Sequence, residues 1–83
     1  MRIEDQIKQV ISEELGIARS KISSSSDVVQ DFRAEPEDMT AIMQATELKF
    51  HIKISIENWS KVKTIKDIAH LVDVYLEIKQ IEM

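Results

Sequence analysis

Apolar residues recur with the period of an α-helix at the start of the chain. In residues 3–15 they form one stripe, which consists of Ile3, Ile7, Val10, Ile11 and Leu15. This is the i, i+4, i+7, i+8 spacing of an amphipathic helix. Gly16 follows the stripe, where a residue in the left-handed conformation commonly ends a helix. The pattern therefore predicts a helix over residues 3–15.

A second helix is predicted over residues 36–50. Pro36 suits its first position, because an N–H there would have no partner within the helix and the fixed φ favours helical backbone. Glu37 and Asp38 fall in the first turn, where the helix dipole favours negative charge. The inward stripe consists of Met39, Ile42, Met43, Thr46 and Phe50, and the outward residues are Ala41, Gln44, Glu47 and Leu48.

The last long helix is predicted to begin after Thr64. Thr64 and Asp67 have the spacing of a capping box, with aspartate in place of the usual glutamate or glutamine. The apolar stripe that follows consists of Ile65, Ile68, Ala69, Val72, Tyr75 and Leu76. We expect the tail, about residues 79–83, to fray.

Two connections join these helices. Residues 17–34 are longer than most loops of a compact domain, and we expect their apolar residues to anchor them: Ile17, Ile22, Val28, Val29 and Phe32. The run Ser23–Ser26 is interpreted as a flexible break between ordered segments, or as an N-cap for a short turn that begins near Asp27. Residues 51–63 begin with alternating isoleucines, but a strand without a partner strand is not stable. We therefore expect an extended link, then a short helix around residues 56–61 with Trp59 packing on one side of it.

Composition limits the chain to one domain over residues 1–83. There is one Gly, one Pro and no Cys, which favours a mostly helical fold and excludes disulfides and thiolate chemistry. No apolar run is long enough to cross a bilayer, and the N-terminus lacks the apolar segment of a signal peptide. We therefore expect a cytoplasmic protein without membrane insertion, and a monomer.

Charge is unevenly distributed along the chain. The net charge is −4, yet residues 49–66 carry Lys49, Lys53, Lys61, Lys63 and Lys66 against Glu57 alone. We interpret these lysines as solvated surface, with a patch for an acidic partner as the alternative. Nucleic acid is not expected as a partner, because the chain is acidic overall and poor in aromatic residues.

The spacing of these features resembles the acyl carrier protein family over about residues 3–76. The resemblance rests on the helix that ends at Leu15-Gly16, on a group of loop residues, and on the start of the last helix. The loop residues are Ile22, Val29, Asp31, Phe32 and Ala34-Glu35, followed by Phe50, Ile54 and Thr64-Ile65. The resemblance implies an all-α, right-handed four-helix bundle with three longer helices, one short helix and a long first loop.

The family's attachment motif, Asp-Ser-Leu, corresponds to Glu35-Pro36-Glu37 in this chain. In the family, the serine hydroxyl is esterified by 4′-phosphopantetheine, whose thiol carries acyl groups. Pro36 has no hydroxyl, and Glu37 stands where the family has an apolar contact, so we expect no bound phosphopantetheine. Arg33 replaces the glycine that is usual before Ala34, and it is either exposed or paired with Glu35 or Asp38.

The resemblance also implies a protein partner, such as a biosynthetic or carrier-recognising enzyme. The candidate partner-binding residues are Glu35, Glu37, Asp38, Ala41, Gln44 and Glu47. We expect a carrier-like protein of lipid or polyketide biosynthesis that binds a partner, is not primed and is not an enzyme. One alternative is a functional carrier modified at an unexpected residue. A second is an unrelated helical adaptor or toxin-neutralising protein.

Catalytic and metal chemistry find little support in the remaining residues. Asp31, Glu35, Glu37 and Asp38 offer oxygen ligands for a cation such as Ca²⁺, but their spacing matches no defined ion-binding loop. His51 and His70 are too far apart in sequence to suggest a zinc site, and no catalytic triad or glycine-rich phosphate loop is present. We therefore expect no catalytic residue and no metal ligand.

Overall fold

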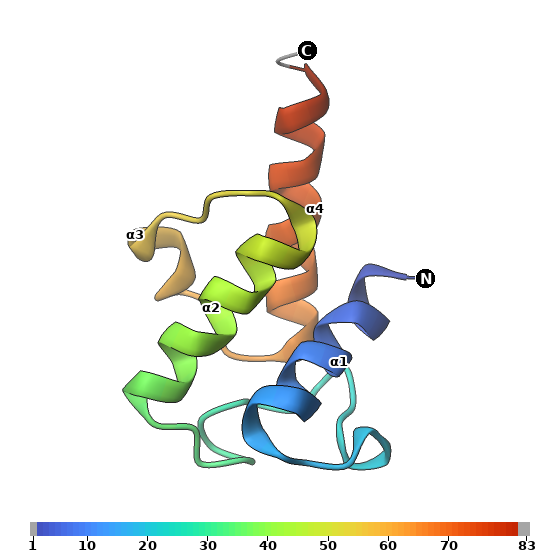
Figure 1. Ribbon diagram of the computed structural model, residues 1–83, viewed down its shortest axis with the longest axis vertical. Helices are drawn as coiled ribbons and strands as arrows, with labels where there is room; N and C mark the ends of the chain where they lie inside the picture. Colours follow the sequence, from blue (N-terminus) through green and yellow to red (C-terminus); the bar gives the residue numbers. More distant parts are fainter. Residues whose placement is uncertain (1, 82–83) are drawn as a thin grey trace.

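A computed structural model of the chain describes residues 2–81, with side chains placed up to Lys79. The elements are α1 (Ile3–Leu15), a 3₁₀ helix η1 (Arg19–Lys21), α2 (Pro36–Phe50), α3 (Ile56–Trp59) and α4 (Ile65–Ile81) (Figure 1). The three long helices begin where the apolar stripes predicted, and α1 ends at Gly16 with φ 66°. The predicted all-helical fold, with three longer helices and one short helix, is confirmed.

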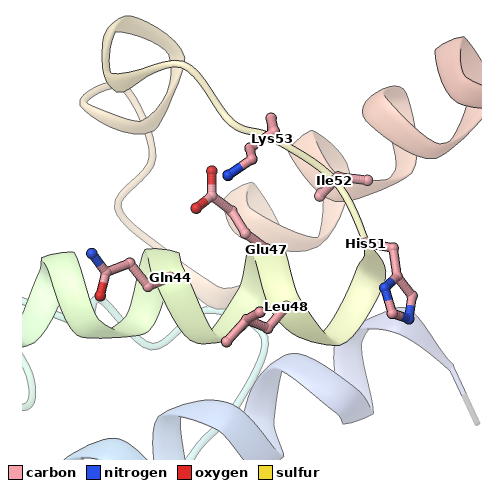
Figure 2. A pocket seen from close by; sticks show the side chains of 6 residues that line it. All are labelled: Gln44, Glu47, Leu48, His51, Ile52 and Lys53. Atoms are coloured by element: carbon pink, nitrogen blue, oxygen red, sulfur yellow. The ribbon is translucent and has the colours of Figure 1, made fainter.

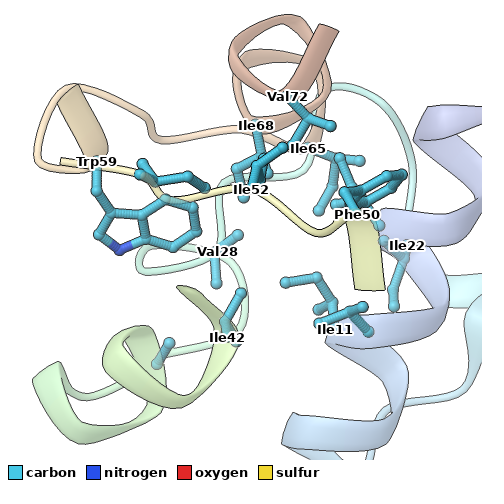
Figure 3. Packing of buried hydrophobic residues seen from close by; sticks show 14 residues of the cluster. Ile11, Ile22, Val28, Ile42, Phe50, Ile52, Trp59, Ile65, Ile68 and Val72 are labelled. Carbon is cyan, nitrogen blue, oxygen red and sulfur yellow. The ribbon is translucent and has the colours of Figure 1, made fainter. Parts of the chain in front are cut away.

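The core lies where α1 contacts both α2 and α4. Its buried residues come from all four α-helices and from both connections, as Figure 3 shows: Ile7, Val10, Ile11, Ile22, Val28, Ala34, Ile42, Phe50, Ile52, Ile54, Trp59, Ile65, Ile68 and Val72. Thr46 is fully buried among them, and its hydroxyl donates to the carbonyl of Ile42 at 2.7 Å. Every helix stripe predicted from the sequence therefore faces this core.

The first loop is anchored, although not by all of the expected residues. Ile22 and Val28 are buried, and Ile17 and Phe32 pack partly against the core. Val29 was wrongly expected to be an anchor: it is 49% exposed. Asp27 forms the turn at this point, because its carboxylate accepts hydrogen bonds from the N–H groups of Val29 and Gln30. The side chain of Val29 is left outside this turn.

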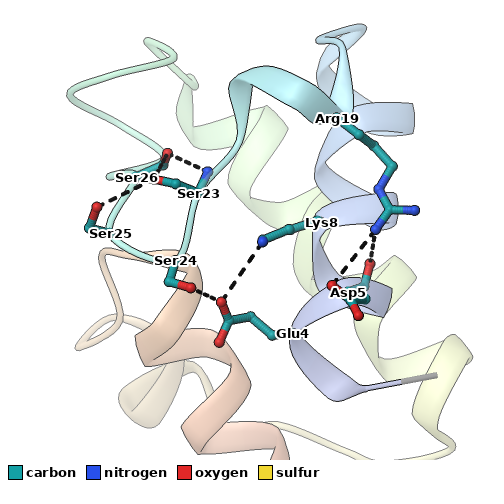
Figure 4. A network of polar contacts seen from close by, with 8 residues as sticks. All are labelled: Glu4, Asp5, Lys8, Arg19, Ser23, Ser24, Ser25 and Ser26. Carbon is teal, nitrogen blue, oxygen red and sulfur yellow. Dashed lines mark hydrogen bonds and ion pairs between the residues drawn. The ribbon is translucent and has the colours of Figure 1, made fainter.

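The serine run is bonded to its surroundings and does not form a free linker. Ser26 is buried, and its hydroxyl oxygen accepts from the N–H of Ser23 at 2.9 Å. Ser24 donates to the carboxylate of Glu4, which also lies 4.0 Å from the ammonium group of Lys8. Figure 4 shows this network joining the loop to the first turns of α1.

Main-chain hydrogen bonds fasten the first loop to the start of α4. The N–H groups of Ile65 and Lys66 donate to the carbonyls of Ser26 and Ser24, at 3.1 and 2.9 Å. The N–H of Val28 donates to the carbonyl of Lys63 at 3.0 Å. The predicted capping box completes this end of the helix, since Thr64 and Asp67 each accept from the other's N–H at 3.1 Å.

Residues 51–55 form the link between α2 and α3: His51 ends α2 in left-handed backbone at φ 55°, and the expected extended segment follows it. Ile52 and Ile54 are buried, whereas Ile56, the first residue of α3, is 76% exposed. The hydroxyl oxygen of Tyr75 on α4 accepts from the N–H of Ser55 at 3.2 Å and from the side-chain amide of Asn58 at 2.9 Å. These bonds hold the link and the short helix against α4.

The end of α4 differs from the expectation of a frayed tail. The helix continues to Ile81, and the ammonium group of Lys79 donates to the carbonyl of His51 at 2.8 Å. This contact ties the last part of the helix to the end of α2. Residues 82 and 83, the rest of the expected tail, lie outside the described residues. Among residues 2–81, no helix is both long enough and apolar enough to span a membrane.

Candidate functional site

The start of α2 is a well-formed helix terminus. Glu35 is extended, with φ −87° and ψ 166°, and Pro36 follows as the first helical residue. The carboxylate of Asp38 accepts from the N–H of Glu35 at 3.0 Å. This bond was not among the predicted features, although an acid three residues after an acidic cap position is a recognisable signal for it. The bond gives Asp38 a structural role in addition to its predicted role in partner binding.

The segment before α2 is fixed by a second pair of acids. The carboxylate of Asp31 accepts from the N–H of Asp27 at 2.7 Å, and the N–H of Asp31 donates to the carbonyl of Asp27 at 2.8 Å. Ala34 is buried, and its N–H donates to the carbonyl of Val28 at 3.3 Å. These bonds therefore fix the conformation of the loop that leads into Pro36.

Arg33 adopts left-handed backbone at φ 55°, which is the conformation that glycine accommodates best. Its side chain is exposed, and within residues 2–81 it forms neither of the pairings with Glu35 or Asp38 considered above. The arginine, which stands where the resemblance implies a glycine, is thus held in this conformation at a cost in backbone strain.

The side chains at the start of α2 do not fit a phosphopantetheine ester. Pro36 is exposed but has no hydroxyl group. The nearest hydroxyl along the helix is that of Thr40, which donates to the carbonyl of Pro36 at 3.1 Å. Glu37 is exposed and presents a carboxylate beside the proline. Pro36 therefore presents no nucleophile for such an ester at the first position of α2.

The predicted partner-binding residues lie along α2 and at its cap, but they do not form one uniform face. Glu35, Glu37 and Gln44 are exposed, and Ala41 is half-buried. Glu47 is also half-buried, because its carboxylate accepts from the N–H of Ile54 at 2.8 Å. Leu48 is 77% exposed and was not among the predicted partner-binding residues. Its position outside the inward stripe was the only signal for it.

The five lysines of residues 49–66 are all exposed, but they do not form a single patch. Lys63 and Lys66 lie beside the first loop, to which their backbone is bonded. Lys53 lies on the link, whose first residue is bonded to Lys79. Because thirteen positions of α4 separate Lys66 from Lys79, these two regions are about 20 Å apart along the helix.

Among the described residues, no group of three or more His, Asp or Glu side chains is arranged to hold a metal ion. Asp31 and Asp38, two of the four acids considered as cation ligands, instead accept hydrogen bonds from backbone N–H groups. Their charge therefore has a local structural explanation.

Comparison with known proteins agrees with this architecture. An acyl carrier protein of Bdellovibrio bacteriovorus is 32% identical over 79 residues, which cover 95% of this chain and 96% of that protein. An acyl carrier protein of Chlamydia caviae is 31% identical over 82% of this chain and 88% of its own length. One from Wolinella succinogenes is 32% identical over 88% of this chain and 96% of its own length.

Among solved structures, the solution structure of a candidate acyl carrier protein from Anaplasma phagocytophilum superposes with a TM-score of 0.77 and 20% identity. The match covers 90% of this chain and 86% of that chain, and it shows a common fold. No protein-family profile matches the sequence. The full-length similarity to the curated relatives and the shared helical fold lead to one conclusion: this chain belongs to the acyl carrier protein family.

Proposed function

We propose that this protein is a carrier-like member of its family that binds a protein partner without carrying phosphopantetheine. The observation that supports the proposal is Pro36 at the first position of α2, in a terminus that is otherwise complete. The cap bond of Asp38 and the fixed loop before it preserve the shape of the platform. The attachment hydroxyl is what the platform lacks.

The partner is proposed to be an enzyme that recognises carriers through the exposed start of α2. Glu35 and Glu37 provide negative charge there, and Ala41 and Gln44 continue the surface along the helix. A basic surface on the partner is the expected complement. Such a protein would act as a scaffold, a regulator or a decoy for the enzymes of lipid or polyketide biosynthesis.

The absence of priming is tested by coexpression with several phosphopantetheinyl transferases and intact mass measurement. We expect the unmodified mass with every transferase. A gain of one phosphopantetheine arm would refute the proposal and favour a functional carrier with an unexpected attachment residue. Peptide mapping would then identify that residue.

A restored variant provides the matched positive control. Pro36→Ser combined with Glu37→Leu replaces both residues that oppose modification while leaving the Asp38 cap in place. We expect this variant to be modified by at least one transferase. If the folded double variant stays unmodified with all of them, the platform is not equivalent to that of a working carrier.

Partner recognition is tested separately, by titrating ¹⁵N-labelled protein with a phosphopantetheinyl transferase. We expect amide shifts at the start of α2 and weaker binding by Glu37→Lys. Asp38→Lys is a poor probe, because it also removes the cap bond to Glu35. Shifts confined to another surface, with no effect of Glu37→Lys, would argue against this binding site.

A further inference from the structure

A second surface lies toward the C-terminal end of α2, the opposite end from Pro36. One hollow of about 550 Å³ lies between α2 and the link, lined by Gln44, Glu47, Leu48, His51, Ile52 and Lys53. Figure 2 shows that these side chains come from the last turns of α2 and from the first residues after it. A second hollow of about 360 Å³ shares the last three of these residues and adds Tyr75, Ile78 and Lys79 of α4. We call the two hollows and their lining residues the link surface.

The link surface exposes large apolar side chains from two helices. Leu48 of α2 is 77% exposed and Ile78 of α4 is 47% exposed. Each borders one of the two adjoining hollows, so the apolar area is gathered around a concave region. Exposed apolar area that is rimmed by polar groups is typical of a binding surface.

The charge of the link surface is opposite to that of the start of α2. Two cationic residues, Lys53 and Lys79, line it, whereas Glu47 is the one carboxylate among the lining residues. That carboxylate already accepts the N–H of Ile54 at 2.8 Å. At the other end of the same helix, the exposed charges are those of Glu35 and Glu37. One helix therefore joins two surfaces of opposite sign.

We propose that the link surface binds an acidic segment of a partner protein, with apolar side chains of that segment entering the two hollows. Charge complementarity indicates that the bound segment is negatively charged, because its carboxylates would lie near Lys53 and Lys79. A short segment meets only this local positive charge. An extended anionic surface such as a membrane would also be repelled by the chain's net charge of −4. Taken with the proposed function, on which this last step alone rests, the protein would join a basic partner at the start of α2 to an acidic partner at its end.

This proposal is tested with a synthetic amphipathic peptide about 15 residues long, roughly four helical turns. The peptide carries leucines on one face and glutamates on the flanks, and a matched peptide carries lysine in place of each glutamate. Binding is followed by amide shifts of ¹⁵N-labelled protein. We expect shifts at residues 48–53 and 75–79 with the glutamate peptide, weaker at higher salt, and no comparable binding of the lysine peptide.

Variants separate the apolar and the charged contributions. Leu48→Ser should weaken binding about tenfold, as expected when a leucine is no longer buried, and Lys53→Gln should weaken it about threefold. Ile56→Ser is the matched apolar control, because Ile56 is 76% exposed at the start of α3. Lys61→Gln is the matched charge control. Both controls should bind like the original protein.

The proposal would be overturned by equal binding of the lysine peptide, by equal weakening in the control variants, or by shifts that map away from the link surface. Tighter binding to phosphatidylglycerol vesicles than to the glutamate peptide would also overturn it, by assigning the surface to lipid. None of these outcomes bears on the start of α2, so the proposed function and this inference fail independently.

Discussion

The left-handed backbone of Arg33 makes a sharp prediction about stability. At φ 55°, a residue with a Cβ atom is strained by roughly 1–2 kcal/mol. Arg33→Gly removes that strain, while the greater freedom of glycine in the unfolded chain returns about 0.5–1 kcal/mol. The exposed arginine side chain forms no hydrogen bond or ion pair within residues 2–81, so little else is lost. We expect a net gain of about 0.5–1 kcal/mol in the free energy of unfolding.

Urea unfolding followed by circular dichroism measures this gain, which corresponds to a Tm increase of about 2–8 °C for a domain of this size. Arg33→Ala is the control, because it removes the side chain but retains a Cβ at the same φ. It should be no more stable than the original protein. If Arg33→Ala were as stable as Arg33→Gly, the gain would come from removing the charge, and the argument from backbone strain would be wrong.

Three further predictions concern other parts of the fold. Gly16→Ala should cost about 1 kcal/mol in urea unfolding, because φ is 66° and the new Cβ would meet no atom within 4 Å, so that backbone strain alone acts. The N–H groups of Thr64 and Lys63 hold the pKa of Asp67 below its ordinary value. The resulting stabilisation is present above the unfolded-state pKa, near 4, and is lost as the pH falls through the folded-state pKa. Asp67→Asn should therefore flatten the loss of stability measured below about pH 4; an unchanged acid profile would contradict this role. Ile68→Val removes one methyl group from a fully buried site and should cost about 0.5–1.5 kcal/mol by the same unfolding assay; a neutral result would mean that the core closes the gap.

The helices could be predicted from the sequence because their signals are local. The periodic stripe before Gly16, the proline at position 36 and the Thr64–Asp67 pair each mark a helix end through residues close in the chain. The first loop was harder, because its conformation depends on partners far away. Val29 has the composition of an anchor, but the turn made by Asp27 leaves it exposed.

The candidate site was predictable in part for the same reason. The position of Pro36 as the first residue of α2 follows from its chemistry. The bond from Ile54 to Glu47 does not, because it depends on how the link returns across α2. The gathering of Leu48 and Ile78 around adjoining hollows likewise depends on the contact between the link and α4, where Lys79 donates to the carbonyl of His51. Sequence periodicity says which side of a helix is outward, but not which outward sides become neighbours.

The main-chain hydrogen bonds between the first loop and the start of α4 affect how fast the amide hydrogens there exchange with water. Amide hydrogens in the first turn of a helix usually exchange rapidly with water, because they have no partner within the helix. Here the amides of Ile65 and Lys66 are bonded to loop carbonyls, and that of Asp67 to its cap residue. The deuterium uptake of the Ile65 and Lys66 amides therefore reports whether the first loop is docked on the start of α4. The first loop and the start of α4 are thus expected to open as one cooperative unit.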